Sequence, residues 1–218
     1  MYFKKLSFIL LIVLTSNYSI AQNKIFKKGI YKTFSDFKAN TPSDTITKFR
    51  IRTGKDTLSH RFYRLDNDKR LKKEFAFCND SGLYVSLKQM IKLFPKEDKK
   101  QLKDDGNYHV KAIQIGKRYI YFEDYFTSRG AVLWGGLIAG SAARRLKPII
   151  FDSNKKVFNL FKNAEDFEKF IREEHQKYLK QLEIKESNDG KKKRKKNIEN
   201  RALIRKIIFE INGKLDEK

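Results

Sequence analysis

The chain has 218 residues, of which 40% are hydrophobic and 13% aromatic, and this content argues for a folded core and against wholesale disorder. Its formal net charge of +23 at pH 7 attracts anions such as lipid headgroups, lipopolysaccharide phosphates, acidic glycans or nucleic acid, although it can also serve solubility alone. The single cysteine, Cys78, excludes an internal disulfide, and we expect this thiol to be buried and inert.

The first 21 residues have the pattern of a secretory signal peptide. Lys4 and Lys5 give a basic start, residues 6–20 form a mostly apolar run, and Gln22 is the expected new N-terminus. The run is short for a membrane span and contains polar residues, so an uncleaved anchor is the less favoured alternative. We therefore expect an exported protein of the periplasm or cell envelope, or one released from the cell.

Residues 22–185 are expected to form one domain of the α+β class, mainly an antiparallel sheet of hairpins with a C-terminal amphipathic helix. Residues 26–42 predict a strand and a short helix, which Thr33 or Ser35 caps and Pro42 ends. Alternating hydrophobicity and turn residues then predict four pairs of strands: 45–52 with 58–65, 74–78 with 83–87, 108–115 with 118–125, and 148–151 with 157–161. Residues 95–106 predict a charged surface connection.

Two helices are expected toward the C-terminus. An apolar stripe predicts a helix over residues 163–184, with Asn163 as its cap. Residues 186–190 lose apolar content and mark the end of the domain. Residues 186–218 are therefore expected to form a basic linker and a second helix, over residues 198–211.

Several short segments carry a family resemblance. They are residues 29–37 (GIYKTFSDF), 41–43 (TPS), 77–80 (FCND) and 83–85 (LYV), together with a Gly/Ala-rich insertion and the closing amphipathic helix. Through them the chain, over residues 28–180, resembles a set of uncharacterised exported proteins of Bacteroidetes-type bacteria. The resemblance implies an exported domain of unknown function, and it carries over no active site.

The insertion at residues 130–143 is uncharged and made of apolar or small residues, and Arg129 precedes it while Arg144 and Arg145 follow it. Fourteen residues are too few to span a bilayer as a helix. They suffice for a segment that enters the membrane interface, with Trp134 at headgroup depth and the arginines on phosphates. The favoured alternative is a buried connector that packs tightly against the sheet.

A run of six cations follows the expected domain: Lys191, Lys192, Lys193, Arg194, Lys195 and Lys196. Such a run is most often a solvated linker. The next helix, however, carries an apolar stripe made of Ile204, Ile207, Ile208 and Ile211. A basic amphipathic helix behind a polybasic run is typical of a segment that binds a membrane surface, but the same stripe can instead dock on the domain.

Lys48, Arg50 and Arg52 fall on one face of an expected strand, which is most simply a solvated face. No OB-fold or RRM signature accompanies the basic residues, so any contact with nucleic acid would be non-specific in sequence. The three histidines lack metal-ligand spacing, and no GxSxG or nucleotide-binding glycine motif is present. We therefore expect no catalytic residues, no metal and no cofactor.

These observations lead to one expected function and its alternatives. We expect an exported, non-enzymatic envelope protein that contacts an anionic membrane or lipopolysaccharide surface. The contact residues would be those that flank or lie in the insertion, Arg129, Trp134, Arg144 and Arg145, and the six cations at residues 191–196. The first alternative is a soluble periplasmic domain that binds a small ligand or a protein partner, and the second is an unrecognised hydrolase.

Overall fold

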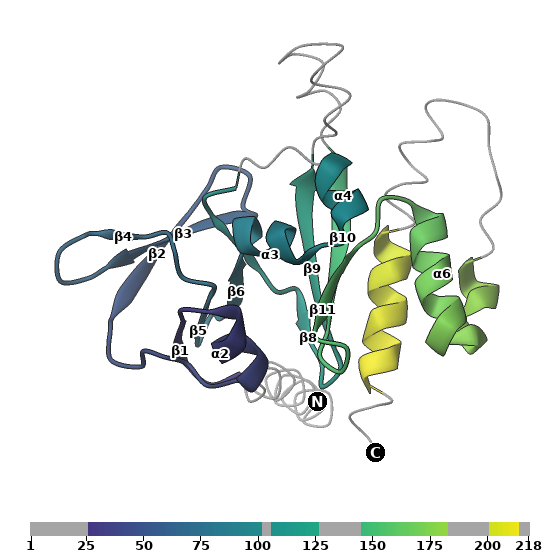
Figure 1. Cartoon of the computed structure of the whole chain (residues 1–218), viewed down its shortest axis with the longest axis horizontal. Coiled ribbons are helices and arrows are strands. Elements are labelled where there is room, and N and C mark those ends of the chain that lie inside the picture. Colours follow the sequence, from purple (N-terminus) through teal and green to yellow (C-terminus); the bar gives the residue numbers. More distant parts are fainter. Residues whose placement is uncertain (1–25, 102–105, 127–144, 183–200, 214–218) are drawn as a thin grey trace, which may run out of the picture.

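The structure, a computed structural model, describes residues 26–101, 106–126, 145–182 and 201–213, which form two antiparallel sheets and the helices around them (Figure 1). The first sheet contains β1 (Gly29–Tyr31), β2 (Phe49–Thr53), β3 (Ser59–Arg64), β4 (Arg70–Leu71), β5 (Ala76–Asn79), β6 (Gly82–Ser86) and β7 (His109–Lys111). Its strand order is β1-β5-β6-β7-β3-β2, and β4 pairs with β3. The second sheet has the order β11-β10-β9-β8, from β8 (Gln114–Ile115), β9 (Tyr119–Phe126), β10 (Arg145–Asp152) and β11 (Val157–Leu160).

Helices lie at the ends and on one side of these sheets. They are α2 (Phe34–Ala39), α3 (Leu87–Leu93), α4 (Lys96–Gln101), α6 (Ala164–Glu174), a 3₁₀ helix (Gln176–Leu182) and a C-terminal helix over residues 201–213. The expected α+β class, the antiparallel hairpins and the C-terminal amphipathic helix are confirmed. No helix within the described ranges is both long and apolar enough to cross a bilayer.

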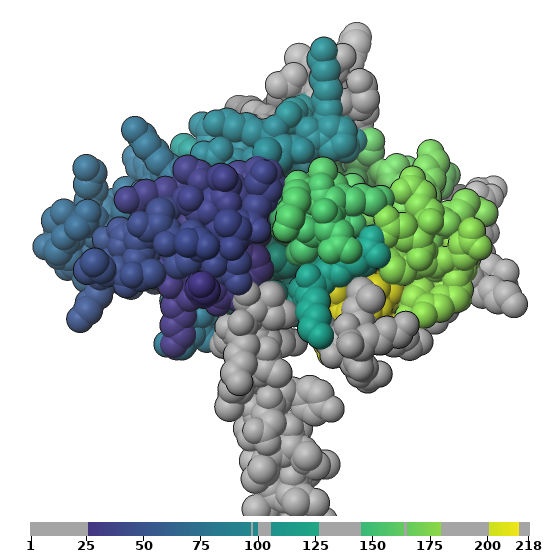
Figure 2. Space-filling model, turned by 60° about the horizontal axis from the view of Figure 1, so that its bottom comes forward, coloured from purple at the N-terminus to yellow at the C-terminus, as the bar shows by residue number. Residues whose placement is uncertain are grey.

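Three apolar clusters hold the elements together. The largest lies between the two sheets and joins aromatic residues from both halves of the chain, including Phe37, Phe75, Phe122, Phe151 and Phe158. Figure 2 shows these two halves, blue and green, in contact along a continuous boundary. A second cluster lies between the second sheet, α6 and the C-terminal helix, and a third lies where Phe62 and Phe77 stack on the first sheet.

Local signals placed several elements correctly. Thr33 caps α2, and its hydroxyl and the Asp36 carboxylate form a reciprocal capping box. Asn163 caps α6 through a 2.9 Å hydrogen bond from the backbone N–H of Asp166. β2 begins at Phe49 and not at residue 45, because the Asp44 carboxylate accepts the backbone N–H groups of residues 46 and 47 and holds a turn there.

Three predictions were wrong in detail. The expected strand 108–115 is two strands, because the chain changes sheets: Ala112 N–H donates to Leu83 O in the first sheet, and Ile113 N–H donates to Tyr121 O in the second. The charged connection contains the helix α4, and α3, capped by Ser86, precedes it. The long helix from residue 163 ends at Glu174, where His175 leaves helical geometry.

Candidate functional site

Most of the predicted contact residues lie outside the described residues. These are Arg129, Trp134 and Arg144 of the insertion and its flanks, and the six cations Lys191, Lys192, Lys193, Arg194, Lys195 and Lys196. Arg145 is described: it is the exposed first residue of β10 and pairs in register with Phe126 of β9. The contact role of these residues therefore stays a prediction.

The isoleucine stripe of the C-terminal helix is buried against the second sheet. Its members are at most 4% exposed and lie in one cluster with Tyr121 and Ile150: Ile204, Ile207, Ile208 and Ile211. Docking on the domain, one of the two alternatives for this stripe, is thereby confirmed. The stripe is consequently occupied by the protein's own core, and a lipid surface cannot reach it while the helix stays docked.

A polar contact reinforces this docking. The guanidinium of Arg205 lies 2.9 Å from the buried carboxylate of Glu123, which also accepts a 2.6 Å hydrogen bond from the Tyr121 hydroxyl. The hydrogen bond to Glu123 raises the pKa of Arg205, while burial raises the pKa of the Tyr121 hydroxyl. Arg205, a cation of the predicted surface helix, is therefore turned toward the sheet.

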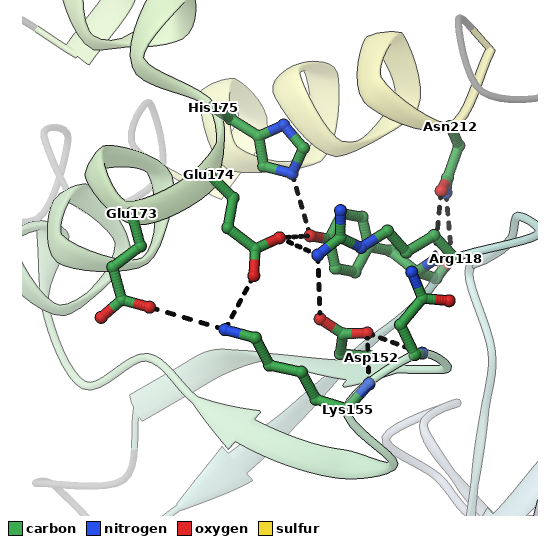
Figure 3. A network of polar contacts seen from close by, with 9 residues as sticks. Arg118, Asp152, Lys155, Glu173, Glu174, His175 and Asn212 are labelled. Atoms are coloured by element: carbon green, nitrogen blue, oxygen red, sulfur yellow. Dashed lines mark hydrogen bonds and ion pairs between the residues drawn. The ribbon is translucent and has the colours of Figure 1, made fainter.

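The tips of the second sheet's two hairpins meet α6 in a network of charged groups, here called the polar lock (Figure 3). Asp152, which is fully buried, accepts the backbone N–H groups of Asn154 and Lys155 at 2.8 and 3.1 Å. Its other carboxylate oxygen lies 3.5 Å from Arg118, which also pairs with Glu174 at the end of α6. Lys155 completes the lock at 2.8 Å from Glu174.

The hydroxyl of Tyr119 connects the lock to the end of α6. Its hydroxyl lies 2.9 Å from Nε2 of His175 and 3.3 Å from Glu174. Burial, together with the nearby charges of Arg118 and Lys177, lowers the pKa of His175 to about 4, so the neutral ring can accept the hydroxyl hydrogen. These contacts hold Glu174 and His175, the residues at which α6 ends.

The backbone of Tyr119 binds the end of the C-terminal helix. The Asn212 amide accepts its N–H at 3.2 Å and donates to its carbonyl at 2.9 Å. A Cβ added at Gly116 would lie 2.0 Å from the Asn212 side chain, so a glycine is required there for space.

Since every charge of the polar lock faces an opposite charge, the lock fixes α6 to the two hairpins of the second sheet. None of its members was predicted, because they come together only in the folded chain.

Few of the other chemically reactive groups are available for chemistry. Cys78 is buried, and burial raises the pKa of its thiol to about 11, as the interpretation of a buried inert thiol requires. His109 is 2% exposed and packs against Phe62 and Phe77. Among the described residues, no cluster of three His, Cys, Asp or Glu side chains could hold a metal ion.

A groove of about 240 Å³ lies where the edge strand β11 meets α4 and α6. Its apolar part includes Phe161 and Phe170, whose ring centroids are 5.4 Å apart. Its polar rim mixes charges, and an ion pair of 2.7 Å joins Lys162 to Asp98. The groove is thus amphipathic and close to neutral, and its volume suits only a small molecule.

Residues 48–73, which contain β2, β3 and β4, form the most strongly charged surface, here called the cationic lobe. They hold ten Lys or Arg residues and three Asp residues, a net charge of +7. The lobe projects from the body of the protein at the left of Figure 1. Seven of its cations form no ion pair with any described residue. Arg70 instead donates a hydrogen bond to the Asn107 carbonyl, and the other six have no side-chain partner among the described residues: Lys48, Lys55, Arg61, Lys69, Lys72 and Lys73.

The register of β2 and β3 gathers arginines around one aromatic ring. Arg50 lies opposite Tyr63, and Arg52 lies opposite Arg61. The guanidinium carbons of Arg50 and Arg52 lie 5.7 and 4.6 Å from the centroid of the Tyr63 ring. The prediction that Arg50 and Arg52 share an exposed face is confirmed, whereas Arg61 and Tyr63 were missed because only the pairing register places them there.

Comparison with protein families places the chain in an uncharacterised group. The model of a family of unknown function, DUF6563, matches residues 29–199. Since this match covers most of the 218 residues, the chain belongs to that family. No curated protein and no solved structure matches the chain. The expected membership of an uncharacterised family is confirmed at this level.

Proposed function

We propose that this member of the DUF6563 family is an exported, non-enzymatic envelope protein that contacts an anionic membrane or glycolipid surface, such as one that contains lipopolysaccharide. The secretory pattern of residues 1–21 supports export to the periplasm or cell envelope, or release from the cell, and the resemblance of residues 28–180 is what implies a Bacteroidetes-type bacterium. The contact is electrostatic, and any binding of nucleic acid to the same cations would be non-specific in sequence.

The cationic lobe is the observation that carries this proposal. A cation near an anionic bilayer contributes about 1 kcal/mol, so the six cations without a side-chain partner among the described residues would contribute at most about 6 kcal/mol. That free energy corresponds to a dissociation constant on the order of 10–100 µM. Leu65, which is 56% exposed on the same lobe, adds apolar surface for the interface.

Contact of this strength is reversible, and stable attachment needs a second signal. We assign that role to the segments predicted from the sequence. One is the insertion, with Trp134 between Arg129 and the pair Arg144 and Arg145, and the other is the run of six cations at residues 191–196. Each segment would add its own charges to those of the lobe in binding an anionic surface.

Vesicle co-sedimentation of the chain from Gln22 onward tests the proposal. The vesicles are phosphatidylcholine alone, phosphatidylcholine with phosphatidylglycerol, or phosphatidylcholine with lipopolysaccharide, each over a series of salt concentrations. The lobe variant carries Lys48→Gln, Lys69→Gln and Lys72→Gln. The control variant removes the same number of charges elsewhere, through Lys32→Gln, Lys88→Gln and Lys92→Gln, all of which are exposed and outside the lobe.

Binding to the anionic vesicles should weaken with salt, and the lobe variant should bind about 100-fold more weakly than the parent, since three cations contribute about 3 kcal/mol. The control variant should lose much less. Equal losses in the two variants would mean that only the total charge matters. No binding to any anionic vesicle at low salt would reject the proposal.

The groove at β11 favours the second candidate, a soluble periplasmic domain that binds a small ligand. It combines an aromatic surface at Phe161 and Phe170 with several charged side chains, as small-molecule sites do. If the vesicle experiment is negative, a ligand screen by nuclear magnetic resonance with Phe170→Ala as the control becomes the next test. A protein partner on the lobe is the remaining alternative.

A further inference from the structure

We propose that Arg50, Arg52 and Arg61 form a binding site for a phosphomonoester group, and that Asp68 occupies this site in the free protein until the ligand displaces it. The inference rests on the proposed function, because it names the chemical group that the cationic lobe would recognise on an anionic surface. It concerns the arginines of the lobe and not its lysines, so the two proposals can fail separately.

The first argument is the position of the Asp68 carboxylate. One of its oxygens accepts hydrogen bonds from Arg50, through Nε at 3.2 Å and through Nη2, while the other lies 3.7 Å from Arg52. A single carboxylate thus bridges two guanidiniums, as an external anion would. The carboxylate is 58% exposed, so water and ligands reach it. The hydrogen bond from Arg50 lowers the pKa of Asp68 and keeps it charged.

The second argument is that two of the guanidiniums are held in place before a ligand binds. Arg50 and Arg52 both lie against the ring of Tyr63, which restricts two otherwise flexible side chains before any ligand arrives. The side chains of Arg50 and Arg52 are 42% and 53% exposed, so they still present their N–H groups to solvent. Ordered and exposed donors reduce the entropy that an anion must overcome on binding.

The third argument is a like-charged pair. Arg61 stands directly opposite Arg52 across the β2–β3 ladder, and Arg61 has no ion partner among the described residues. Like charges in directly opposite positions destabilise a sheet, and an anion bound between them removes the repulsion. The register therefore places a third arginine next to Arg52, and Asp68 forms no ion pair with it.

Charge complementarity selects the ligand. The displaced Asp68 carboxylate stays attached beside the three arginines, so the local net charge is +2, which a phosphomonoester close to its dianionic form neutralises. Planar guanidiniums bind the oxygens of phosphate in pairs, whereas a monoanionic carboxylate would only replace Asp68 by its equivalent. We therefore assign phosphate carried on a glycolipid as the ligand, and inorganic phosphate as its soluble counterpart.

The test compares Asp68→Asn with Asp66→Asn. Both variants remove one negative charge from the lobe, but Asp66 pairs with Arg64 and not with the site. Asp68 has a φ of 53°, a left-handed conformation that asparagine adopts readily, so the exchange should not disturb the turn. Each protein is titrated with inorganic phosphate while its arginine Nε–H resonances are followed, and is sedimented with lipopolysaccharide vesicles.

Asp68→Asn should bind phosphate and vesicles roughly 3- to 10-fold more tightly than Asp66→Asn, because the two exposed ion pairs of Asp68 no longer compete with the ligand. Adding Arg61→Gln should remove the gain. Equal affinities of the two variants would overturn the inference, as would a gain that survives Arg61→Gln. Phosphate binding at this site without vesicle binding by the parent protein would keep the site and reject the surface proposal.

Discussion

His109 should make the stability of the fold depend on pH. The ring is 2% exposed, lies 3.1 Å from the carbonyl oxygen of Glu74 through Nε2, and contacts Phe62 and Phe77. Burial lowers its pKa to about 4, against an ordinary value near 6.5. The unfolded chain therefore takes up a proton at this residue before the folded protein does. Stability is complete above about pH 6.5 and falls as the pH drops toward 4.

The two pKa values set the size of this effect. Between pH 7 and pH 5, the preferential protonation of the unfolded state should lower the free energy of unfolding by about 2 kcal/mol at this residue alone. His60, the cross-strand neighbour, also has a lowered pKa because of burial, and it acts in the same direction. The effect of His109 must therefore be isolated by comparison with a variant.

His109→Phe provides that comparison, because phenylalanine keeps an aromatic ring against Phe62 and Phe77 but cannot take up a proton. Urea unfolding followed by circular dichroism at pH 7, 6 and 5 gives the free energy of unfolding for both proteins. Whatever the stability of the variant at pH 7, its loss of stability between pH 7 and pH 5 should be smaller than that of the parent by about 2 kcal/mol. Parallel pH dependences would refute the argument.

Three further predictions concern the core and the polar contacts. Ile207→Ala should lower the free energy of unfolding by about 2–5 kcal/mol in urea titrations, as for a core residue; a change below about 0.5 kcal/mol would mean that the C-terminal helix is peripheral. Gly116→Ala should cost about 1–3 kcal/mol because its Cβ would collide with Asn212, and Asn212→Ala should relieve part of that cost in a double-mutant cycle; additive losses would argue against the contact. Cys78 should react with a thiol reagent at pH 8 only after denaturation, and rapid labelling of the native protein would contradict its burial.

The sequence was most informative where the deciding interactions are local. The capping box of Thr33 and Asp36 and the turn between β5 and β6 involve residues within four positions of one another, so their patterns predict them directly. The change of sheet at Ala112 and Ile113 has no such signal. The alternation of apolar and polar residues shifts its phase there, since Ala112 and Ile113 are adjacent and both apolar, but only their distant partners, Leu83 and Tyr121, decide which sheet each joins.

The same distinction applies to the candidate site. Alternation along β2 was sufficient to place Arg50 and Arg52 on one exposed face. The register with β3 was needed to bring Tyr63 and Arg61 to that face, and the turn before β4 was needed to bring Asp68. Sequence alone therefore indicated a charged surface, whereas the pairing of strands turned part of it into a geometry that can hold one anion.

The C-terminal helix shows what this means for experiments on surface binding. A stripe of isoleucines behind a run of cations has the same pattern whether it meets a membrane or the protein core. Here the stripe packs on the second sheet, and the Asn212 side chain forms two hydrogen bonds with the backbone of Tyr119. A chain truncated before residue 190 would expose that sheet face and lose stability, so weaker vesicle binding would not identify the cations at 191–196 as the contact. Their replacement by glutamine in the full-length chain leaves the helix in place and isolates the effect of charge.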